Sequence, residues 1–434
     1  MSYPKALNAE QIVKKLDEYA KLKHEYGAQG IEAVINETSE FLNSQIQKMI
    51  NLKNDENMAA KEPDDLDKIK KLRGPSERRL WKDFDSVLYK DRVKGALLGR
   101  FAGCTLGAPV EFWQIDDMES WADWTGDEFP STNYWSAVKK PNEFRYKKSR
   151  FHEYTRDAMN GVPVDDDIIY TLLGLLIAED HGLDFKTADV GKAWLKYLPY
   201  AATAEAVALD NLRKGIPADK CGETDNPFVQ WIGADIRSDP FGYLAPGLPE
   251  KAAEMAYYDA YISHRRNGIY GEMYFSAVIA AAFACSNAVD ALNAGLNEIP
   301  NQCALYKDLL WALETGNSVR DYRHARNLVN ERFAGMSGVH TNNNAALTIF
   351  GLILGKDDFD KVIGQTVAMG LDNDCNGATA GSIFGTSYGI SAIPEKWYEK
   401  FGNKIHSYLI DNEEFAIDDV LRRFEALAAK HWVV

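Results

Sequence analysis

Two short clusters of aspartates lie far apart in the sequence, and each precedes a strongly helical stretch. Residues 165–167 read Asp-Asp-Asp before an apolar run, and residues 372–374 read Asp-Asn-Asp before a run of small residues. Adjacent carboxylates repel each other unless a cation or the positive end of a helix offsets the repulsion. They cannot bind one ion from positions i and i+2 of a regular helix, but they can converge in the turn before it. Two such turns, brought face to face, would form the all-oxygen site that Mg²⁺, Mn²⁺ or Ca²⁺ prefers.

Helix capping is the alternative explanation for these aspartates. Aspartate is a favoured N-cap residue and suits the positive end of the helix dipole, so a single aspartate at such a position is more often a cap than a ligand. Three aspartates in a row exceed what capping needs. A second cluster in the same position relative to its helix favours the metal-binding interpretation.

The composition excludes several classes of protein. The chain of 434 residues is 46% hydrophobic and 26% charged, which is typical of a soluble globular protein. Its formal net charge of −15 argues against nucleic acid as a partner, because phosphate binding needs clustered Lys and Arg. The apolar runs are too short to cross a membrane. Five widely spaced cysteines without a CxxC pattern fit a reducing compartment, so we expect a cytoplasmic protein.

The hydrophobic pattern predicts an N-terminal extension. Residues 9–50 carry apolar faces at helical spacing, interrupted by Gly27 and Gly30, and therefore predict a helical hairpin. Charged residues then dominate as far as Pro75, which indicates a linker with at most one short helix. We expect a hairpin and linker over residues 1–75 and a main domain over residues 76–434. An exposed amphipathic hairpin could serve dimerisation, so the protein could be a homo-oligomer.

The hydrophobic pattern of the main domain predicts an all-α fold, because its apolar residues recur every three or four positions and strand-like alternation is scarce. A glycine at every fourth position from Gly95 to Gly107 forms a smooth stripe on a helix, which allows another backbone to approach closely. Pro109 ends this helix, and Glu111 follows it as a candidate acid/base or ligand. Helices are expected over residues 92–104, 190–198, 249–264, 271–288, 343–354 and 359–369.

Several segments, in this order, resemble the ADP-ribosylglycohydrolase family, which includes dinitrogenase reductase-activating glycohydrolases and the jellyfish J1 crystallins. Residues 103–111 read GCTLGAPVE and resemble the motif G-D-A-x-G-x-P-x-E, and residues 165–167 resemble T-D-D-T. Residues 263–268 read SHRRNG and resemble a T-H helix start. Residues 370–375 read GLDNDC and resemble G-x-D-T-D-T, and residues 393–397 read IPEKW and resemble a closing I-P-x-x-W.

The resemblance implies a compact orthogonal bundle of many helices with a cleft that holds two Mg²⁺ or Mn²⁺ ions. It implies hydrolysis of an N- or O-glycosidic bond in a small-molecule or ADP-ribosylated substrate, or in a related ribosyl substrate. Glu111 would be the acid/base, and Asp166 would be both catalytic and a metal ligand. The implied metal ligands are Asp165, Asp166, Asp167, Asp372 and Asp374. The implied substrate-binding residues are Asn226, Gly233, Arg237, His264 and Asn267.

The chain departs from the family pattern at five positions. Cys104 replaces an aspartate, Asp165 and Ile168 replace the threonines of the first cluster, and Asn373 and Cys375 replace those of the second. A thiol is a poor substitute for a hydroxyl near Mg²⁺. Two other functions therefore stay open: a catalytically inactive member that resembles the crystallins or only binds ADP-ribose, and a metal-dependent nucleotide phosphoesterase.

Overall fold

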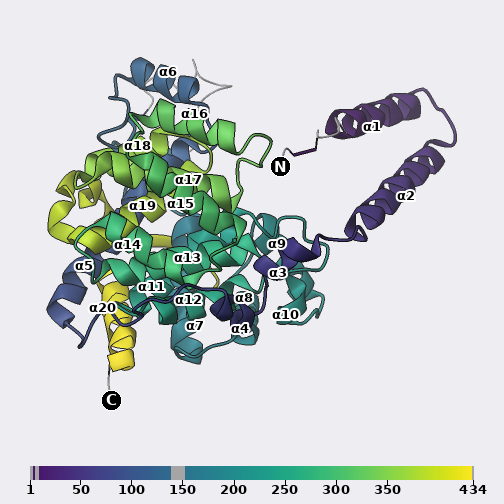
Figure 1. Cartoon of the computed structure of the whole chain (residues 1–434). Coiled ribbons are helices and arrows are strands. Elements are labelled where there is room, and N and C mark those ends of the chain that lie inside the picture. The colour runs from purple at the N-terminus through teal and green to yellow at the C-terminus, as the bar shows by residue number, and fades with distance from the viewer. Residues whose placement is uncertain (1–2, 5–8, 138–151, 433–434) are drawn as a thin grey trace. The chain divides into compact units, whose positions relative to one another are not determined.

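The computed structural model describes residues 3–4, 9–137 and 152–432, and it divides the chain into two compact units (Figure 1). The first unit ends at Ala60, and the second begins at Lys61. The first unit contains helices α1 (Ala9–Glu25) and α2 (Ile31–Ile50), at the positions that the hydrophobic pattern predicts. No residue of these two described helices is buried, so their apolar faces are largely exposed.

The charged segment after α2 is more ordered than its composition suggests. It contains two short helices, α3 (Glu56–Lys61) and α4 (Leu66–Lys71), where at most one was expected. The carboxylate of Asp64 accepts a hydrogen bond from the backbone N–H of Arg266, at 2.6 Å. Asp64 and α4 belong to the second unit, and a hairpin and linker over residues 1–75 stay a prediction.

The second unit consists almost entirely of helices, which confirms the all-α class. After α4, its α-helices are α5 (Ser86–Gly107), α6 (Ile115–Thr125), α7 (Asp166–His181), α8 (Thr187–Tyr197), α9 (Thr203–Arg213), α10 (Ala218–Cys221), α11 (Asp239–Leu244), α12 (Pro249–Ala260), α13 (Asn267–Ala282), α14 (Ala288–Gly295), α15 (Ala304–Gly316), α16 (Tyr322–Arg332), α17 (Thr341–Gly355), α18 (Phe359–Ala368), α19 (Asn373–Tyr388) and α20 (Ile417–Ala428). Short 3-10 helices include η1 (Ala108–Val110) and η4 (Ile232–Arg237). No helix in the described part of the chain is long and apolar enough to span a lipid bilayer.

All six helices predicted for the main domain are present, and three of them, α5, α17 and α18, begin at a side-chain N-cap. Asp85 starts α5 by accepting hydrogen bonds from two backbone N–H groups of the first turn. The helix expected over residues 271–288 ends earlier, at Ala282, and Asn287 caps the next helix by accepting a hydrogen bond from the N–H of Asp290. The predicted helix is therefore too long at its C-terminal end.

Helices α5 and α19 pack against each other through glycines, as the glycine stripe predicts. At each contact a Cβ atom added to the glycine of α5 would collide with the backbone of α19. The paired positions run in opposite directions along the chain, so the two helices are antiparallel. They are Gly95 with Gly385, Gly99 with Gly381, and Gly103 with Gly377. Beyond them Gly107 packs on the backbone of Asp374, which brings the end of α5 to the start of α19.

Arg100 joins this helix pair to the first aspartate cluster. Its guanidinium is fully buried in α5 and donates to the carboxylate of Asp239 at 2.7 Å. It also donates to the backbone carbonyls of Asp167 at 2.6 Å and Ile236 at 2.7 Å. Removing one partner of such a buried pair typically costs about 3–5 kcal/mol. A single side chain thus connects α5 with the beginning of α7 and with η4.

The described residues form one small sheet, a hairpin of β1 (Ile405–Leu409) and β2 (Asn412–Phe415). Val162 forms a parallel bridge with Ile405, and its carbonyl accepts a hydrogen bond from the N–H of His406 at 3.1 Å. The hairpin therefore lies beside the segment that leads into the first aspartate cluster.

We expect Gly103→Ala to lower the free energy of unfolding by about 1–3 kcal/mol or more, because overpacking forces two closely packed backbones apart. Urea denaturation followed by circular dichroism measures this loss. Gly74→Ala is the matched control, since a Cβ at that position meets only the Asn297 side chain, at an ordinary distance of 3.6 Å. The control should be neutral or slightly stabilising. Equal stability of the two variants would contradict the close contact between α5 and α19.

Candidate active site

The first group of acidic side chains comes from the end of α5 and the start of α19. Glu111, Asp372 and Asp374 each offer an oxygen, and these three oxygens lie within 4.8 Å of one another. The backbone beside them is strained, since φ is +60° at Phe112 and +63° at Leu371. The two strained residues are hydrogen bonded to each other, with the Phe112 N–H donating to the Leu371 carbonyl at 3.1 Å. Such strain persists only where surrounding structure enforces it, and it concentrates at functional sites.

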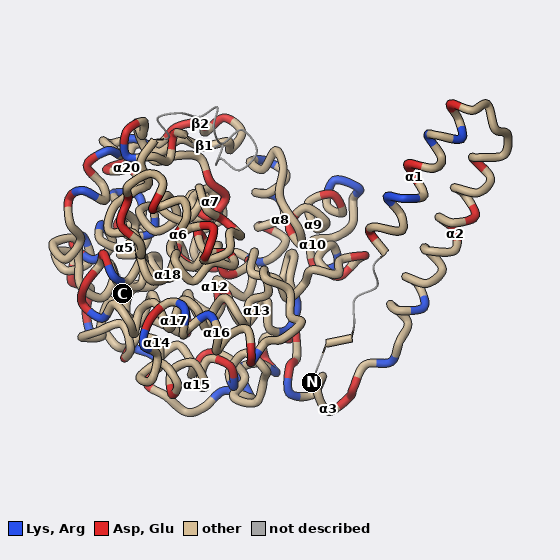
Figure 2. The backbone as a smooth tube through the Cα atoms, turned by 90° about the horizontal axis from the view of Figure 1, so that it is seen from above, with Lys and Arg blue, Asp and Glu red and all other residues tan. Residues whose placement is uncertain are grey.

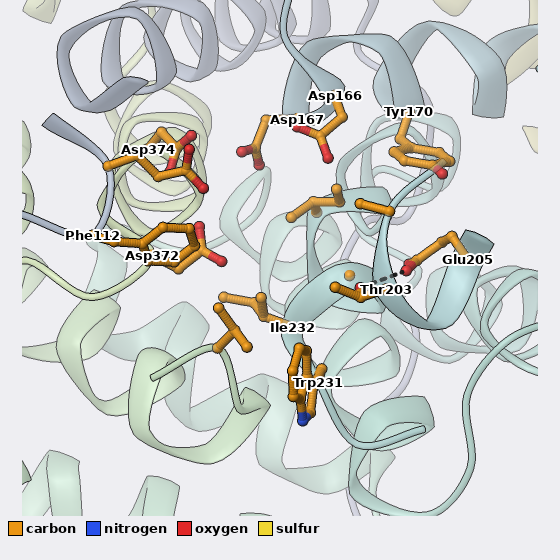
Figure 3. A pocket seen from close by; sticks show the side chains of 15 residues that line it. Phe112, Asp166, Asp167, Tyr170, Thr203, Glu205, Trp231, Ile232, Asp372 and Asp374 are labelled. Carbon is orange, nitrogen blue, oxygen red and sulfur yellow. Dashed lines mark hydrogen bonds between the residues drawn. The ribbon is translucent and has the colours of Figure 1, made fainter. Parts of the chain in front are cut away.

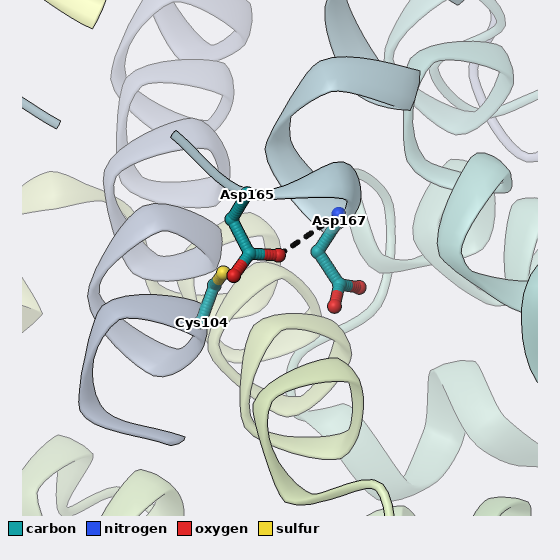
Figure 4. A group of neighbouring side chains, drawn as sticks. All are labelled: Cys104, Asp165 and Asp167. Carbon is teal, nitrogen blue, oxygen red and sulfur yellow. Dashed lines mark hydrogen bonds between the residues drawn. The ribbon is translucent and has the colours of Figure 1, made fainter. Parts of the chain in front are cut away.

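The second group lies at the start of α7. Cys104, Asp165 and Asp167 each offer one atom, again within 4.8 Å of one another (Figure 4). Asp165 is the N-cap of α7, and its carboxylate accepts a hydrogen bond from the Asp167 N–H at 3.1 Å. Burial raises the pKa of the Cys104 thiol well above its usual value, and the nearby aspartates add to the shift. The thiol therefore stays protonated in the metal-free protein.

The tube in Figure 2 shows acidic residues gathered beside α7. Burial raises the pKa of Asp374 to about 8, and its neighbour Glu111 adds to the shift. Burial likewise raises the pKa of Glu111 to about 7, with further contributions from Asp166 and Asp167. One carboxylate oxygen of Asp374 is buried without a hydrogen-bond partner. Crowded carboxylates with an unpartnered oxygen are suited to bind a divalent cation, which would offset their repulsion.

The fifth predicted ligand, Asp166, differs from the others because its side chain is exposed. It lines the cavity in front of both acidic groups, and Figure 3 shows it beside Asp167 and across from Asp372 and Asp374. The structure therefore brings Glu111 and all five predicted metal ligands together from three separate segments of the chain.

Two cavities adjoin these acids, and Glu111, Asp166 and Asp374 line both of them. The first cavity has a volume of about 180 Å³ and the second of about 300 Å³. The first extends from the acids to a wall formed by Thr203, Glu205, Trp231, Ile232, Gly233 and Val339 (Figure 3). The second has tyrosines in its wall, namely Tyr154, Tyr170, Tyr200 and Tyr408. A substrate held over the acids would therefore have space on two sides.

Among the residues expected to bind substrate, Gly233 lines the first cavity, whereas Arg237 does not. The Arg237 side chain is only 1% exposed and forms ion pairs with Asp259 at 3.1 Å and Glu272 at 3.3 Å. The positive charge of Arg237 is therefore paired with carboxylates inside the protein, behind the loop that carries Gly233.

The other three expected binding residues also lie outside the lining of both cavities. The amide of Asn226 donates to the carbonyl of Ser263 at 3.1 Å. The ring of His264 is fully buried, with its Nδ1 at 2.8 Å from the Ser263 hydroxyl. The Asn267 amide donates to Gln230 at 2.8 Å. In the structure these side chains connect the segments around the cavity, and a direct contact with substrate stays a prediction.

Three features of the site were not anticipated from the sequence. The sequence does indicate that Arg100 is unusual, since it is the one charged residue in a run of small and apolar residues. Glu205 had no such indication, because a carboxylate in the first turn of α9 is favourable in any helix. Tyr200 and Tyr408 also had none, since they lie far apart in the chain and their rings meet only in the fold, with centroids 4.5 Å apart.

Comparison with known proteins agrees with this geometry. The model of the ADP-ribosylglycohydrolase family matches residues 85–429. The chain belongs to the ADP-ribosylglycohydrolase family. One similar solved structure is described as an ADP-ribosylglycohydrolase-related protein complex. It is 20% identical with a TM-score of 0.52, covering 80% of this chain and 99% of that one, and so supports the fold alone. A comparison with curated proteins gives no match.

We expect Asp374→Asn to abolish stabilisation by Mg²⁺ or Mn²⁺ while leaving the metal-free fold intact or slightly more stable. The amide removes one of several mutually repelling charges and with it a metal ligand. For the unaltered protein, a cation at 100 times its Kd raises the free energy of unfolding by about 2.7 kcal/mol. Thermal unfolding with and without cation measures the effect. The control is Asp357→Asn, which changes an exposed aspartate in the turn between α17 and α18 and should keep the full stabilisation. Undiminished stabilisation of Asp374→Asn would remove this residue from the ligand set.

The stability of the metal-free protein should fall as the pH rises. Glu111 and Asp374 have pKa values raised to about 7 and about 8, whereas carboxyls of an unfolded chain titrate near pH 4. From about pH 4 to about pH 8 the native state therefore binds more protons, and the free energy of unfolding decreases with pH. Urea denaturation in chelator at pH 5 and pH 8 tests this. Asp374→Asn should flatten the slope, and an unchanged slope would argue against carboxylate crowding as its cause.

Proposed function

We propose that this protein is a metal-dependent hydrolase that cleaves an N- or O-glycosidic bond at the anomeric carbon of a ribosyl group. Membership of the ADP-ribosylglycohydrolase family supports glycohydrolase activity in general. The observation that carries the proposal is that two aspartate clusters and Glu111 meet where two cavities join. We further propose Mg²⁺ or Mn²⁺ as the cation, a small-molecule or ADP-ribosylated substrate, and action in the cytoplasm.

The residues present fit a pair of cations. The first group supplies three carboxylates, from Glu111, Asp372 and Asp374. The second group supplies two, and its third member, Cys104, is a protonated thiol that can hydrogen bond to Asp165. Exposed Asp166 lies in front of both groups. Divalent cations held here would lower the pKa of a water molecule and neutralise charge that develops during cleavage.

The protein's own side chains would orient and protonate the substrate. Hydrolysis at an anomeric carbon passes through an oxocarbenium-like state and requires a proton for the leaving group. Glu111 borders both cavities, so its carboxyl can reach the bond between their contents and give or take a proton. Asp166 faces the same space and can orient a sugar hydroxyl or the attacking water. Holding these groups at fixed positions contributes to rate by itself.

We expect Glu111→Gln to lower kcat by about 10²–10⁴-fold while keeping metal binding, because the amide retains the shape of the side chain but cannot transfer a proton. Release of 4-nitrophenol from 4-nitrophenyl ribofuranosides, with and without an ADP group at the 5′ position, measures turnover. Isothermal titration with Mn²⁺ measures metal binding.

The matched control is Glu314→Gln, which changes an exposed glutamate on α15 that lines neither cavity. It should preserve both turnover and metal binding. Unaltered turnover of Glu111→Gln would exclude Glu111 from proton transfer. Metal binding without hydrolysis of any riboside by the unaltered protein would favour a binding protein over an enzyme.

A further inference from the structure

The N-terminal hairpin of α1 and α2 carries most of the large apolar side chains that the described chain exposes. Of 22 such side chains in the described residues, 12 lie between Ile12 and Leu52. Phe41 is 61% exposed and Met49 is 71% exposed. Since a fully exposed aromatic side chain presents about 150–250 Å², these residues together expose on the order of 1,000 Å². The largest apolar patch of a typical monomer is only about 300–600 Å², and larger patches mark interaction surfaces.

The exposed residues of α2 form one continuous stripe. Val34 and Ile35 are followed seven residues later by Phe41 and Leu42, and Met49 lies seven residues beyond Leu42. Because seven residues make almost two helical turns, these side chains share one face of the helix. Two adjacent apolar positions in each repeat make the stripe about 100° wide. That width is typical of a helix in the core of a bundle and exceeds the narrow seam of a two-stranded coiled coil.

The shorter helix α1 has the same pattern. Ile12 and Val13 are followed seven residues later by Tyr19 and Ala20, with Leu16 between the two pairs. The two helices make few contacts with each other, and neither contains a buried residue. Helices in water are stabilised mainly by the packing of their apolar face. The hairpin therefore supplies two helices of a bundle without the helices that would cover them.

The second unit, taken by itself, has no comparable surface. In its described part the exposed large apolar side chains are distributed over α5, α6, α8, α14, α15 and four connecting segments. None of these helices carries more than one of them, whereas α2 alone carries seven. Single exposed apolar residues are normal on a folded domain and do not form a docking face. The main domain therefore lacks an apolar face that matches the two stripes.

The charges of the hairpin argue against a lipid surface as its partner. Helix α1 contains four lysines and four acidic residues, and α2 contains three glutamates and one lysine. Helices that lie on a membrane carry an excess of Lys and Arg, which attracts anionic headgroups. Neither helix has that excess. A protein surface of near-neutral charge fits better, and an identical hairpin is such a surface.

From these observations we infer that the hairpin binds the hairpin of a second copy of this chain, so that the two hairpins form a four-helix bundle. A second copy supplies the same pair of wide stripes, and a two-fold axis lets each hairpin cover the other. The exposed apolar area on each hairpin, on the order of 1,000 Å², is sufficient, because a stable interface buries about 800 Å² on each partner. The inference is independent of the proposed hydrolase function.

Sedimentation equilibrium of the full-length protein over a range of concentrations tests this inference. The unaltered chain of 48.6 kDa should sediment with twice that mass. Phe41→Asp and Met49→Asp should each raise the dissociation constant of the dimer at least about a hundredfold, because a two-fold axis buries each new charge twice. Asn43→Asp is the matched control, since it adds the same charge at an exposed position outside the stripe. The control should remain a dimer.

Three outcomes would overturn the inference. One is a monomeric mass of the unaltered protein at every concentration, and co-sedimentation of that monomer with phosphatidylserine vesicles would assign the hairpin to a lipid surface. Another is a dimer that neither stripe variant weakens, since it would form through a different surface. The third comes from hydrogen exchange of the unaltered protein, which does not depend on the folding of a variant. Amides of α1 and α2 should exchange at least about tenfold more slowly in the dimer than in the diluted monomer, and equal rates would contradict the bundle.

Discussion

The contact between the glycine faces of α5 and α19 determines where the acidic residues of this protein can meet. Glycines at every fourth position let the two backbones touch, and the antiparallel pairing places the end of one helix at the start of the other. Glu111 follows the first helix, and Asp374 opens the second. Because Gly107 packs directly on the backbone of Asp374, any side chain at that position would separate the two acids. The spacing of the first acidic group thus depends on the absence of a side chain at Gly107, about one helical turn before Glu111.

The same construction places several carboxylates where their mutual repulsion is costly. Burial and neighbouring charge raise the pKa values of Asp165, Asp167 and Asp372 well above normal. Arg100 provides the opposing charge, but its contacts are mainly with Asp239 and with backbone carbonyls. The fold therefore tolerates an unfavourable cluster rather than neutralising it. Such local instability is typical of a site that is completed by a ligand.

Sequence reasoning anticipated the part of the site in which local pattern and chemistry coincide. The aspartate clusters sit at helix starts, the glycine stripe predicts a close helix pair, and Pro109 predicts where Glu111 leaves the helix. Each of these features can be recognised from a short, continuous stretch of the sequence. The tyrosine pair of Tyr200 and Tyr408 could not be anticipated, since it depends on how β1 packs beside the chain before α7. The burial of Arg237 was equally hidden, because a loop arginine gives no sign in the sequence of the acids that will surround it.

These two kinds of residue correspond to two parts of the site. The acids that would carry out the reaction are held by helix starts and glycine contacts, so the family resemblance locates them. The wall that would recognise the rest of the substrate is assembled from Thr203, Glu205, Trp231 and Gly233, on segments joined by long-range contacts. Resemblance in the first part does not determine the second, because the wall residues are brought together by packing between distant segments and not by the motifs. A chain can therefore belong to a family through its reaction centre while its cavity wall favours a different substrate.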